Sequence, residues 1–428
     1  MRLGSRPHRR TALCAAGPTA GGKRLLCFRL GHTASSGSRP RSSGASPRWI
    51  TVRNSLSRRS RSEACEPETV VDNADPPSEA HLVRLLAGQA PEAGKPEPGN
   101  SAALLASLLA NWQILPALEP TLLDAALVEE DHVRFVRGRL AVTAFVQAQI
   151  AGCAAFLAAL DSAGIRYALL KGAAAGCLLY PERHLRGAWD FDLGVGWDDL
   201  EEAEALALDC GFHQAQRDPE RGRFVRADRA LRAIVEESHF ELGFLARRLR
   251  VTNLPDDTRA AIRDEPWTHQ FWHDATTDSP WCYAVVDIHH KLSLDIELGG
   301  LLACSWQKPY PDHVIGLPDF AWFGAHLIFK LYWESVHTYG KGLYQYADLV
   351  RLVPLLDPIT FLRMVSILRD HNLIAAGYHV LKHLPRFGVA VPAHVAEFLA
   401  EASAAPPGTD PIDTNDLGDL WPKLWGRR

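Results

Sequence analysis

The sequence has 428 residues, of which 47% are hydrophobic, so the chain can bury a large core and is long enough for two or three structural units. Residues 1–62 carry 14 basic and no acidic side chains. The remainder of the chain therefore has 32 of the 46 basic side chains and all 50 acidic ones, which gives it a formal charge of −18. This acidic body argues against general nucleic-acid affinity, which needs a clustered basic surface. The absence of an apolar run of about 20 residues argues against a membrane span.

Residues 1–80 are predicted to form a disordered basic N-terminal extension. The segment is rich in Ser, Gly, Pro and Arg, a composition that cannot supply a packed core. An organellar transit peptide is one interpretation of an Arg-rich start without acidic residues. An over-extended gene start is favoured, because Met1 and Met364 are the only methionines and the heavy use of Ala, Arg and Gly is typical of a GC-rich bacterial genome.

Helical periodicity dominates the next part of the chain. Apolar residues recur with helical spacing at 81–86 and again at 101–115, after a Pro- and Gly-rich break. A longer helix is predicted from about 133 to 163, where Gly164 ends it. Residues 81–145 are therefore predicted to be an N-terminal helical region.

Strand-like spacing appears within residues 146–310, the predicted core. Strands are predicted at 166–170, 189–195, 233–242 and 282–289, and helices at 173–180 and 198–210. Trp267, Phe271 and Trp272, in the polar stretch before the last strand, are expected to pack as a lid or insert.

The chain then returns to helical spacing. Residues 311–405 form the predicted C-terminal helical region, and residues 406–428, which are rich in Pro, Gly and Asp, are predicted to be a loose tail. The eight cysteines form no Cys-x-x-Cys pair and no zinc-like Cys/His cluster. We expect reduced thiols and a soluble cytoplasmic protein.

Asp190 and Asp192 are the residues with the clearest chemical meaning. Alternate residues of a strand share a face, so both carboxylates are expected to point to the same side while Phe191 points into the core. Converging carboxylates usually bind a hard divalent cation such as Mg²⁺. An exposed strand with two solvated carboxylates is the alternative, but this pair lies in an otherwise apolar strand, where unpaired carboxylates are hard to tolerate.

A set of short motifs surrounds this pair in a fixed order. The motifs are Leu170-Lys171-Gly172, Tyr180-Pro181, Arg186, Asp190-Phe191-Asp192 and Asp287-Ile288-His289. With them, residues of roughly 150–350 resemble the uncharacterised nucleotidyltransferases of the DNA polymerase beta superfamily. Better-known members of the superfamily have a Gly-Ser pair where this chain has Lys171-Gly172. The resemblance implies an α+β fold, with a small mixed β-sheet nucleotidyltransferase core flanked by N-terminal and C-terminal helical regions.

Asp287 is the predicted third carboxylate. Alternation along 285–289 places Asp287 and His289 on one face, as a strand beside the Asp192 strand would require. Glu241 competes for this role, because it too lies on a predicted strand. Asp190, Asp192 and Asp287 are thus the predicted catalytic and metal-binding residues, and His289 is expected to be structural or to orient the substrate.

Lys171, Gly172 and Arg186 are the predicted nucleotide-binding residues. A transferring phosphoryl group needs preorganised cations, which Lys171 and Arg186 can supply. Either residue is alternatively an ordinary surface cation. The segment 344–349 resembles a helix of the family's C-terminal region and is interpreted as packing.

The resemblance implies transfer of a nucleoside monophosphate from an NTP, which we expect to be ATP, to an acceptor hydroxyl with release of pyrophosphate. Two Mg²⁺ ions are expected, held by the three aspartates. The acceptor is left open between a small molecule, a protein side chain and an RNA end. A degenerate nucleotidyltransferase fold that acts as a binding or assembly module is the alternative, since fold alone does not decide function.

Overall fold

The computed structural model describes residue 85 and residues 98–124, 126–218, 223–227, 240–264, 271–273, 279–293, 296–310, 313–337, 344–387 and 389–404. The chain divides into two compact units, Met1–Ala64 and Cys65–Arg428, and the described residues all belong to the second. The predicted N-terminal extension 1–80 and the predicted tail 406–428 lie outside the described residues.

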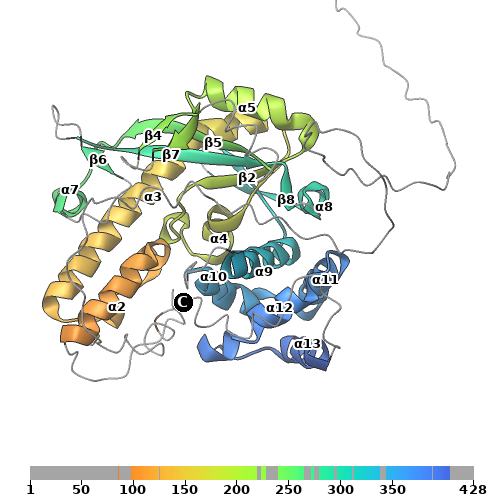
Figure 1. Ribbon diagram of the computed structural model, residues 1–428. Helices are drawn as coiled ribbons and strands as arrows, with labels where there is room; N and C mark the ends of the chain where they lie inside the picture. The colour runs from red at the N-terminus through yellow and green to blue at the C-terminus, as the bar shows by residue number, and fades with distance from the viewer. Residues whose placement is uncertain are drawn as a thin grey trace, which may run out of the picture. The chain divides into compact units, whose positions relative to one another are not determined.

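A seven-stranded mixed sheet forms the centre of the described part (Figure 1). Six strands follow the order β1-β2-β7-β5-β3-β4, and β6 pairs with β7 beside this path. Only β2 and β7 pair in parallel; the other described pairs of this sheet are antiparallel. The strands are β1 Tyr167–Leu169, β2 Phe191–Val195, β3 His213–Arg217, β4 Phe224–Arg226, β5 Glu241–Arg250, β6 Trp272–His273 and β7 Pro280–His289. The predicted α+β fold with flanking helices is confirmed.

The long helix α3, Glu129–Ala163, covers one face of this sheet. It packs on the apolar residues of β7 that alternate with the polar ones, and a Cβ at Gly152 would lie 2.7 Å from that of Ala284, so the helix approaches the strand closely. Gly164 ends it in the left-handed conformation, as predicted. By length and composition α3 passes as a membrane-spanning helix, but over half of its apolar stretch is buried, as in the core helix of a soluble protein.

The helices around β1 and β2 follow the predicted order. They are α4 Lys171–Leu179, η3 Arg183–Leu185, η4 Trp197–Asp199 and α5 Leu200–Asp209. One boundary differs in a way that concerns the site: β2 begins at Phe191, so Asp190 lies in the bend just before the strand and only Asp192 lies within it.

The region between β4 and β7 departs most from the sequence-based prediction. Of the strand predicted at 233–242, residues 233–239 lie outside the described part, and β5 continues to Arg250. Trp272 belongs to β6 and its ring stacks on that of Trp281 with centroids 4.9 Å apart, so it extends the sheet, in place of the expected lid. Trp267 lies outside the described residues.

Helices dominate both ends of the described chain. On the N-terminal side are α2 Pro98–Ala110, η1 Trp112–Ala117 and η2 Pro120–Leu122. A further helix, α7 Asp256–Asp264, follows β5 in the chain and packs beside α3. After β7 come two hairpins that the sequence did not predict, with a short helix between them. These are β8 Lys291–Ser293, β9 Ile296–Glu297, α8 Gly299–Ala303, β10 Trp306–Pro309 and β11 Val314–Leu317.

The C-terminal helices lie below the sheet in the orientation of Figure 1. They are α9 Phe320–His337, α10 Tyr344–Leu352, η5 Val353–Leu355, α11 Pro358–Asp370, α12 Ile374–Leu381, η6 Leu384–Phe387 and α13 Ala393–Ala404. The first two, α9 and α10, contact α4, the helix that begins at Lys171. The polar faces of α9 and α10 therefore come close to the residues at the start of α4.

Candidate active site

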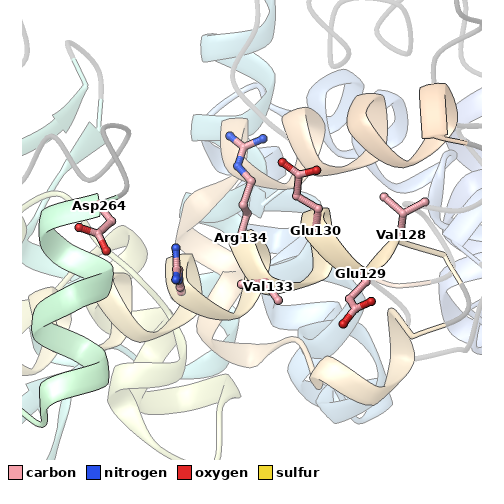
Figure 2. A pocket seen from close by; sticks show the side chains of 7 residues that line it. Val128, Glu129, Glu130, Val133, Arg134 and Asp264 are labelled. Atoms are coloured by element: carbon pink, nitrogen blue, oxygen red, sulfur yellow. The ribbon is translucent and has the colours of Figure 1, made fainter.

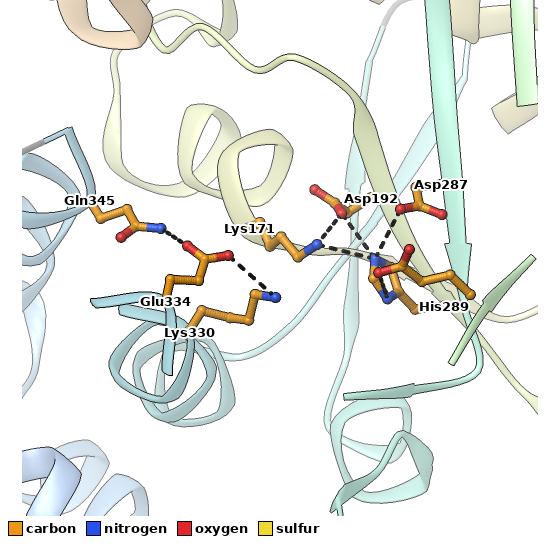
Figure 3. Close-up of polar contacts among 8 residues, drawn as sticks. Lys171, Asp192, Asp287, His289, Lys330, Glu334 and Gln345 are labelled. Carbon is orange, nitrogen blue, oxygen red and sulfur yellow. Dashed lines mark hydrogen bonds and ion pairs between the residues drawn. The ribbon is translucent and has the colours of Figure 1, made fainter. Parts of the chain in front are cut away.

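Asp192 and Asp287 lie side by side on the two parallel strands. The register of β2 and β7 pairs Asp192 with Asp287, so both carboxylates project from the same face of the sheet (Figure 3). Their exposed fractions are 2% and 3%. Two carboxylates buried this deeply require compensating positive charge or hydrogen-bond donors.

Lys171 supplies one positive charge to this pair. Its Nζ donates a hydrogen bond to Asp192 Oδ1 over 2.5 Å and lies 3.3 Å from His289 Nε2. Lys171 is the first residue of α4 and has a φ of 45°, a left-handed conformation that is unusual for a residue with a side chain. Burial opposes ionisation of Asp192, but the Lys171 charge and the hydrogen bond from His289 hold its pKa well below the usual range.

His289 lies between the carboxylates. Its Nε2 is 2.9 Å from Asp192 Oδ1 and 3.8 Å from Asp287 Oδ2, and its Nδ1 is 3.5 Å from Glu241 Oε1. Burial, and next the positive charge of Lys171, lower the pKa of His289. A neutral imidazole in this position orients Asp192 without adding charge.

Asp287 is the less satisfied of the two buried carboxylates. Burial, and then the negative charges of Glu241 and Asp192, raise its pKa well above the usual value. Its Oδ1 is buried and has no hydrogen-bond partner in the described part of the chain. The charge of Lys171 offsets the ionised form in part, but the Lys171 hydrogen bond goes to Asp192.

Glu241 and Asp190 complete the acidic cluster. A β-bulge between Glu241 and Phe244, with Gly243 at a φ of 76°, brings Glu241 opposite His289. Asp190 lies in the bend just before β2, two residues from Asp192 in the chain. The structure therefore brings together Asp192, Asp287 and also Glu241, which the sequence treated as a competitor of Asp287.

The donor set of this cluster fits a metal ion. One ligand atom each from Asp192, Asp287 and His289 lie within 4.8 Å of one another, and all three residues are buried. The unpartnered Asp287 Oδ1 is an acceptor that a cation would satisfy. The buried Asp-Asp-His cluster can thus hold a metal ion.

Arg186 has a different position from the one its predicted role would suggest. Its Nε lies 2.9 Å from Asp348 Oδ1 and its Nη2 lies 2.8 Å from Asp348 Oδ2, and both side chains are almost fully buried. The hydroxyl of Tyr180 donates to the same carboxylate over 2.9 Å. The guanidinium thus anchors the segment before Asp190 to α10, and its proposed contact with phosphate stays a prediction.

Gly172 lies next to Arg186, where a side chain would crowd the guanidinium. A Cβ at this position would lie 3.4 Å from Arg186 Nη1 and 3.3 Å from the Cβ of Ala188. A glycine after Lys171 therefore leaves room for the buried arginine beneath the start of α4. The predicted Lys-Gly pair has one member at the carboxylates and the other against the Arg186 side chain.

The sequence-based analysis missed a polar row on α9. His326, Lys330 and Glu334 recur every four residues, so they share one face of a helix that is otherwise largely apolar. Lys330 Nζ lies 3.4 Å from Glu334 Oε1, and Gln345 Nε2 donates to Glu334 Oε2 over 2.5 Å (Figure 3). Burial, then the charges of Lys330 and Lys171, lower the pKa of His326 well below the usual value. The four-residue spacing of polar groups was the signal that could have identified this row.

A surface hollow elsewhere on the chain has no connection to these residues. It lies between the start of α3 and the end of α7 and is lined by charged side chains that include Glu129, Glu130, Arg134, Arg137 and Asp264 (Figure 2). Its lining contains none of the carboxylates at β2 and β7. The chemistry is therefore assigned to the acidic cluster and not to this hollow.

Comparison with known proteins gives one match. The model of a family described as uncharacterised nucleotidyltransferase matches residues 102–387, about two thirds of the chain. This range includes every residue of the acidic cluster and the Arg186–Asp348 pair. None of the curated proteins matches the chain.

Proposed function

The chain belongs to this family of uncharacterised nucleotidyltransferases, and we propose that it transfers a nucleoside monophosphate from an NTP to an acceptor hydroxyl, with release of pyrophosphate. The observation that supports this most is the pairing of the buried Asp192 and Asp287 on parallel strands, with an unpartnered Asp287 oxygen beside them. A carboxylate cluster of this kind is suited to divalent-cation chemistry. We propose Mg²⁺ as the cation and ATP as the nucleotide.

The three aspartates would hold the metal. Asp190, Asp192 and Asp287 offer carboxylate oxygens, the ligands that Mg²⁺ prefers, while His289 would orient Asp192 through the contact described above. Bound there, Mg²⁺ would neutralise charge on the nucleotide phosphates and lower the pKa of the acceptor hydroxyl.

Asp287 is the proposed proton acceptor in the transfer step. The acceptor oxygen attacks the α-phosphorus, a new phosphorus–oxygen bond forms, and the bond to the pyrophosphate oxygen breaks. The hydroxyl proton passes to Asp287, whose buried Oδ1 has no hydrogen-bond partner among the described residues and can accept it. Pyrophosphate leaves with its electron pair on the bridging oxygen.

Lys171 is the proposed phosphate ligand. It lies at the first residue of α4, where the helix N-terminus favours negative charge, and its ammonium already lies within the acidic cluster. In the nucleotide complex, Lys171 would exchange part of its contact with Asp192 for a phosphate oxygen. Arg186 is proposed to act as a positioning residue that fixes the Gly172 backbone and the Asp190 bend.

The same Lys171–Asp192 contact favours the second candidate, a binding or assembly module without catalysis. An ammonium 2.5 Å from Asp192 neutralises one carboxylate without a metal. In such a module the fold would bind a nucleotide or a partner without transferring the nucleotide. Because the five described cysteines are free, we propose a cytoplasmic location for either function.

The two candidates differ in a direct experiment. The purified full-length protein is incubated with each α-labelled NTP, Mg²⁺ and a cell extract, and the labelled product is identified. We expect labelled product with wild-type protein, none after chelation of the metal, and none with Asp192→Asn. Asp319→Asn, which removes a carboxylate paired with Arg363 away from the cluster, is the matched control and should retain activity. NTP binding without product in any condition would support the binding module instead.

A further inference from the structure

Four arginines gather on the sheet face that carries the carboxylates. They are Arg217 on β3, Arg223 and Arg226 at β4, and Arg248 on β5, and we call them the arginine cluster. Arg248 is opposite Tyr283 in the register of β5 and β7, and Tyr283 shares its face with Asp287 because the two are four residues apart on one strand. Arg226 pairs with Ala215, which packs with Tyr283 in the same small core.

The members of the arginine cluster are exposed and lack anionic partners among the residues that the structure describes. In the described part of the chain, no carboxylate forms an ion pair with any of the four, whereas Arg134, Arg186, Arg263 and Arg363 each do. The body of the protein carries a formal charge of −18, so carboxylates are not in short supply. A local group of exposed cations without carboxylate partners in an otherwise acidic protein is a surface that attracts anions.

Cation–π contacts explain part of this arrangement. The guanidinium of Arg248 lies 4.0 Å from the centroid of the Trp281 ring, and that of Arg217 lies 4.8 Å from the centroid of Trp189. Such contacts stabilise an arginine on an aromatic surface. Arg226 makes no ring contact among the described residues. Burial lowers the pKa of His213, and the nearby charge of Arg226 lowers it further. A purely structural role therefore leaves Arg226 unexplained.

The arginine cluster and the acidic cluster are neighbours. Tyr283, opposite Arg248, precedes Asp287 by four residues of strand, or roughly 13 Å. Trp189, which carries Arg217 on its ring, is the residue directly before Asp190 in the chain. A ligand of a few extended nucleotides can bridge this separation.

We infer that the arginine cluster binds the phosphates of a single-stranded RNA whose terminal hydroxyl is the acceptor at the acidic cluster, an inference that rests on the proposed function. All four cations are arginines, whose planar guanidinium donates to two phosphate oxygens at once. Arginines beside aromatic rings are the usual composition of a single-strand binding surface. The negative net charge argues only against general affinity, because binding depends on the local surface.

The test is the salt dependence of RNA binding by the full-length protein. Anisotropy of a fluorescein-labelled single-stranded RNA of about 12 nucleotides is measured between about 50 and 200 mM salt. The variant Arg217→Gln/Arg226→Gln/Arg248→Gln should show a slope of log K against log salt that is shallower by about 2, since each lost phosphate contact contributes about 0.7. The corresponding triple Lys variant keeps the charges and should restore most of the slope.

Two further variants separate binding from folding. Arg226→Gln removes a charge without a ring contact, so its slope should fall by about 0.7 with an unchanged melting temperature. Arg137→Gln, on α3 in the hollow of Figure 2, removes another exposed arginine and should leave RNA binding unchanged.

Each outcome has a definite meaning. Wild-type protein that does not bind the RNA, or slopes that are unchanged in the Gln variants, overturn the inference. Tighter binding of polyglutamate than of RNA overturns it in favour of an acidic protein partner. If the protein binds RNA through the arginines but binds no NTP, the arginine cluster is an RNA-binding surface. The same result overturns the proposed function and, with it, the role of the RNA as acceptor. Labelling of the RNA end by an α-labelled NTP supports both.

Discussion

The buried pair of Arg186 and Asp348 gives the sharpest prediction about stability. In Asp348→Asn the Arg186 guanidinium stays charged and 3% exposed while its counter-charge is lost. Leaving one member of a buried pair uncompensated typically costs 3–5 kcal/mol, so we expect the free energy of unfolding to fall by about 3 kcal/mol, with Asn retaining some of the hydrogen bonds. Urea unfolding followed by tryptophan fluorescence measures this change.

The double variant Arg186→Met/Asp348→Leu tests the cause of that loss. Replacing both members of a buried pair by apolar groups is often nearly neutral, so stability should return to within about 2 kcal/mol of the wild type, the remaining loss coming from the Tyr180 hydroxyl, whose acceptor is removed. A loss below about 1 kcal/mol in Asp348→Asn, or a double variant as unstable as the sum of the single variants, would refute the assignment of a coupled buried pair. Because Arg186 is proposed to be a positioning residue, the Mg²⁺-dependent affinity for NTP should fall to a similar extent whether Arg186 or its partner Asp348 is replaced. A large loss in a folded double variant that Asp348→Asn does not share would instead make Arg186 a phosphate ligand, as the sequence suggested.

Four other predictions concern the acidic cluster and the chain ends. Asp192→Asn should abolish Mg²⁺-dependent transfer and lower the stability of the metal-free protein. The depressed pKa of Asp192 means that its ionised form stabilises the fold above about pH 4, so equal thermal stability of the variant and the wild type would contradict this. The raised pKa of Asp287 has the opposite effect, so metal-free wild-type protein should lose stability as the pH rises above about 4. Melting curves at several pH values should show that Asp287→Asn removes this part of the pH dependence. Lys171→Met should weaken ATP binding far more than adenosine binding in calorimetry, and equal losses for both ligands would argue against a phosphate contact. Deletion of residues 1–80 should leave the melting temperature nearly unchanged, and a large drop would show that they fold onto the body.

The sequence predicted the site where the physical rule was local. The two-residue period of a strand placed Asp287 and His289 on one face, and the pairing of β2 with β7 then set Asp287 beside Asp192. The start of β2 was less predictable, because Trp189 and Asp190 fit a strand pattern but lie in the bend before it. The β-bulge that brings in Glu241 was missed, since it depends on the positive φ of Phe240 and Gly243.

Residues whose partners are distant in sequence could not be assigned from the sequence alone. Arg186 and Asp348 are 162 residues apart, and neither position indicates the other until the helices pack against α4. The position of Trp272, which was expected in a lid or insert, could not be predicted for a related reason: it pairs with β7 and its ring stacks on that of Trp281, and both contacts are tertiary. The polar row on α9 did have a local signal in its four-residue spacing, but its meaning depends on what faces it.

The parallel pairing of β2 with β7 also has a consequence for protein synthesis. The ribosome completes β2 about 90 residues before β7 exists, so β2, with Asp192 on it, must wait without its inner neighbour. Pairings between residues so far apart in the chain form late in folding. Truncated products that end before residue 280 would expose an apolar strand edge, which is prone to aggregate. The buried pair of Arg186 with Asp348 can form only after α10 has been made, so the segment before Asp190 is anchored late in translation.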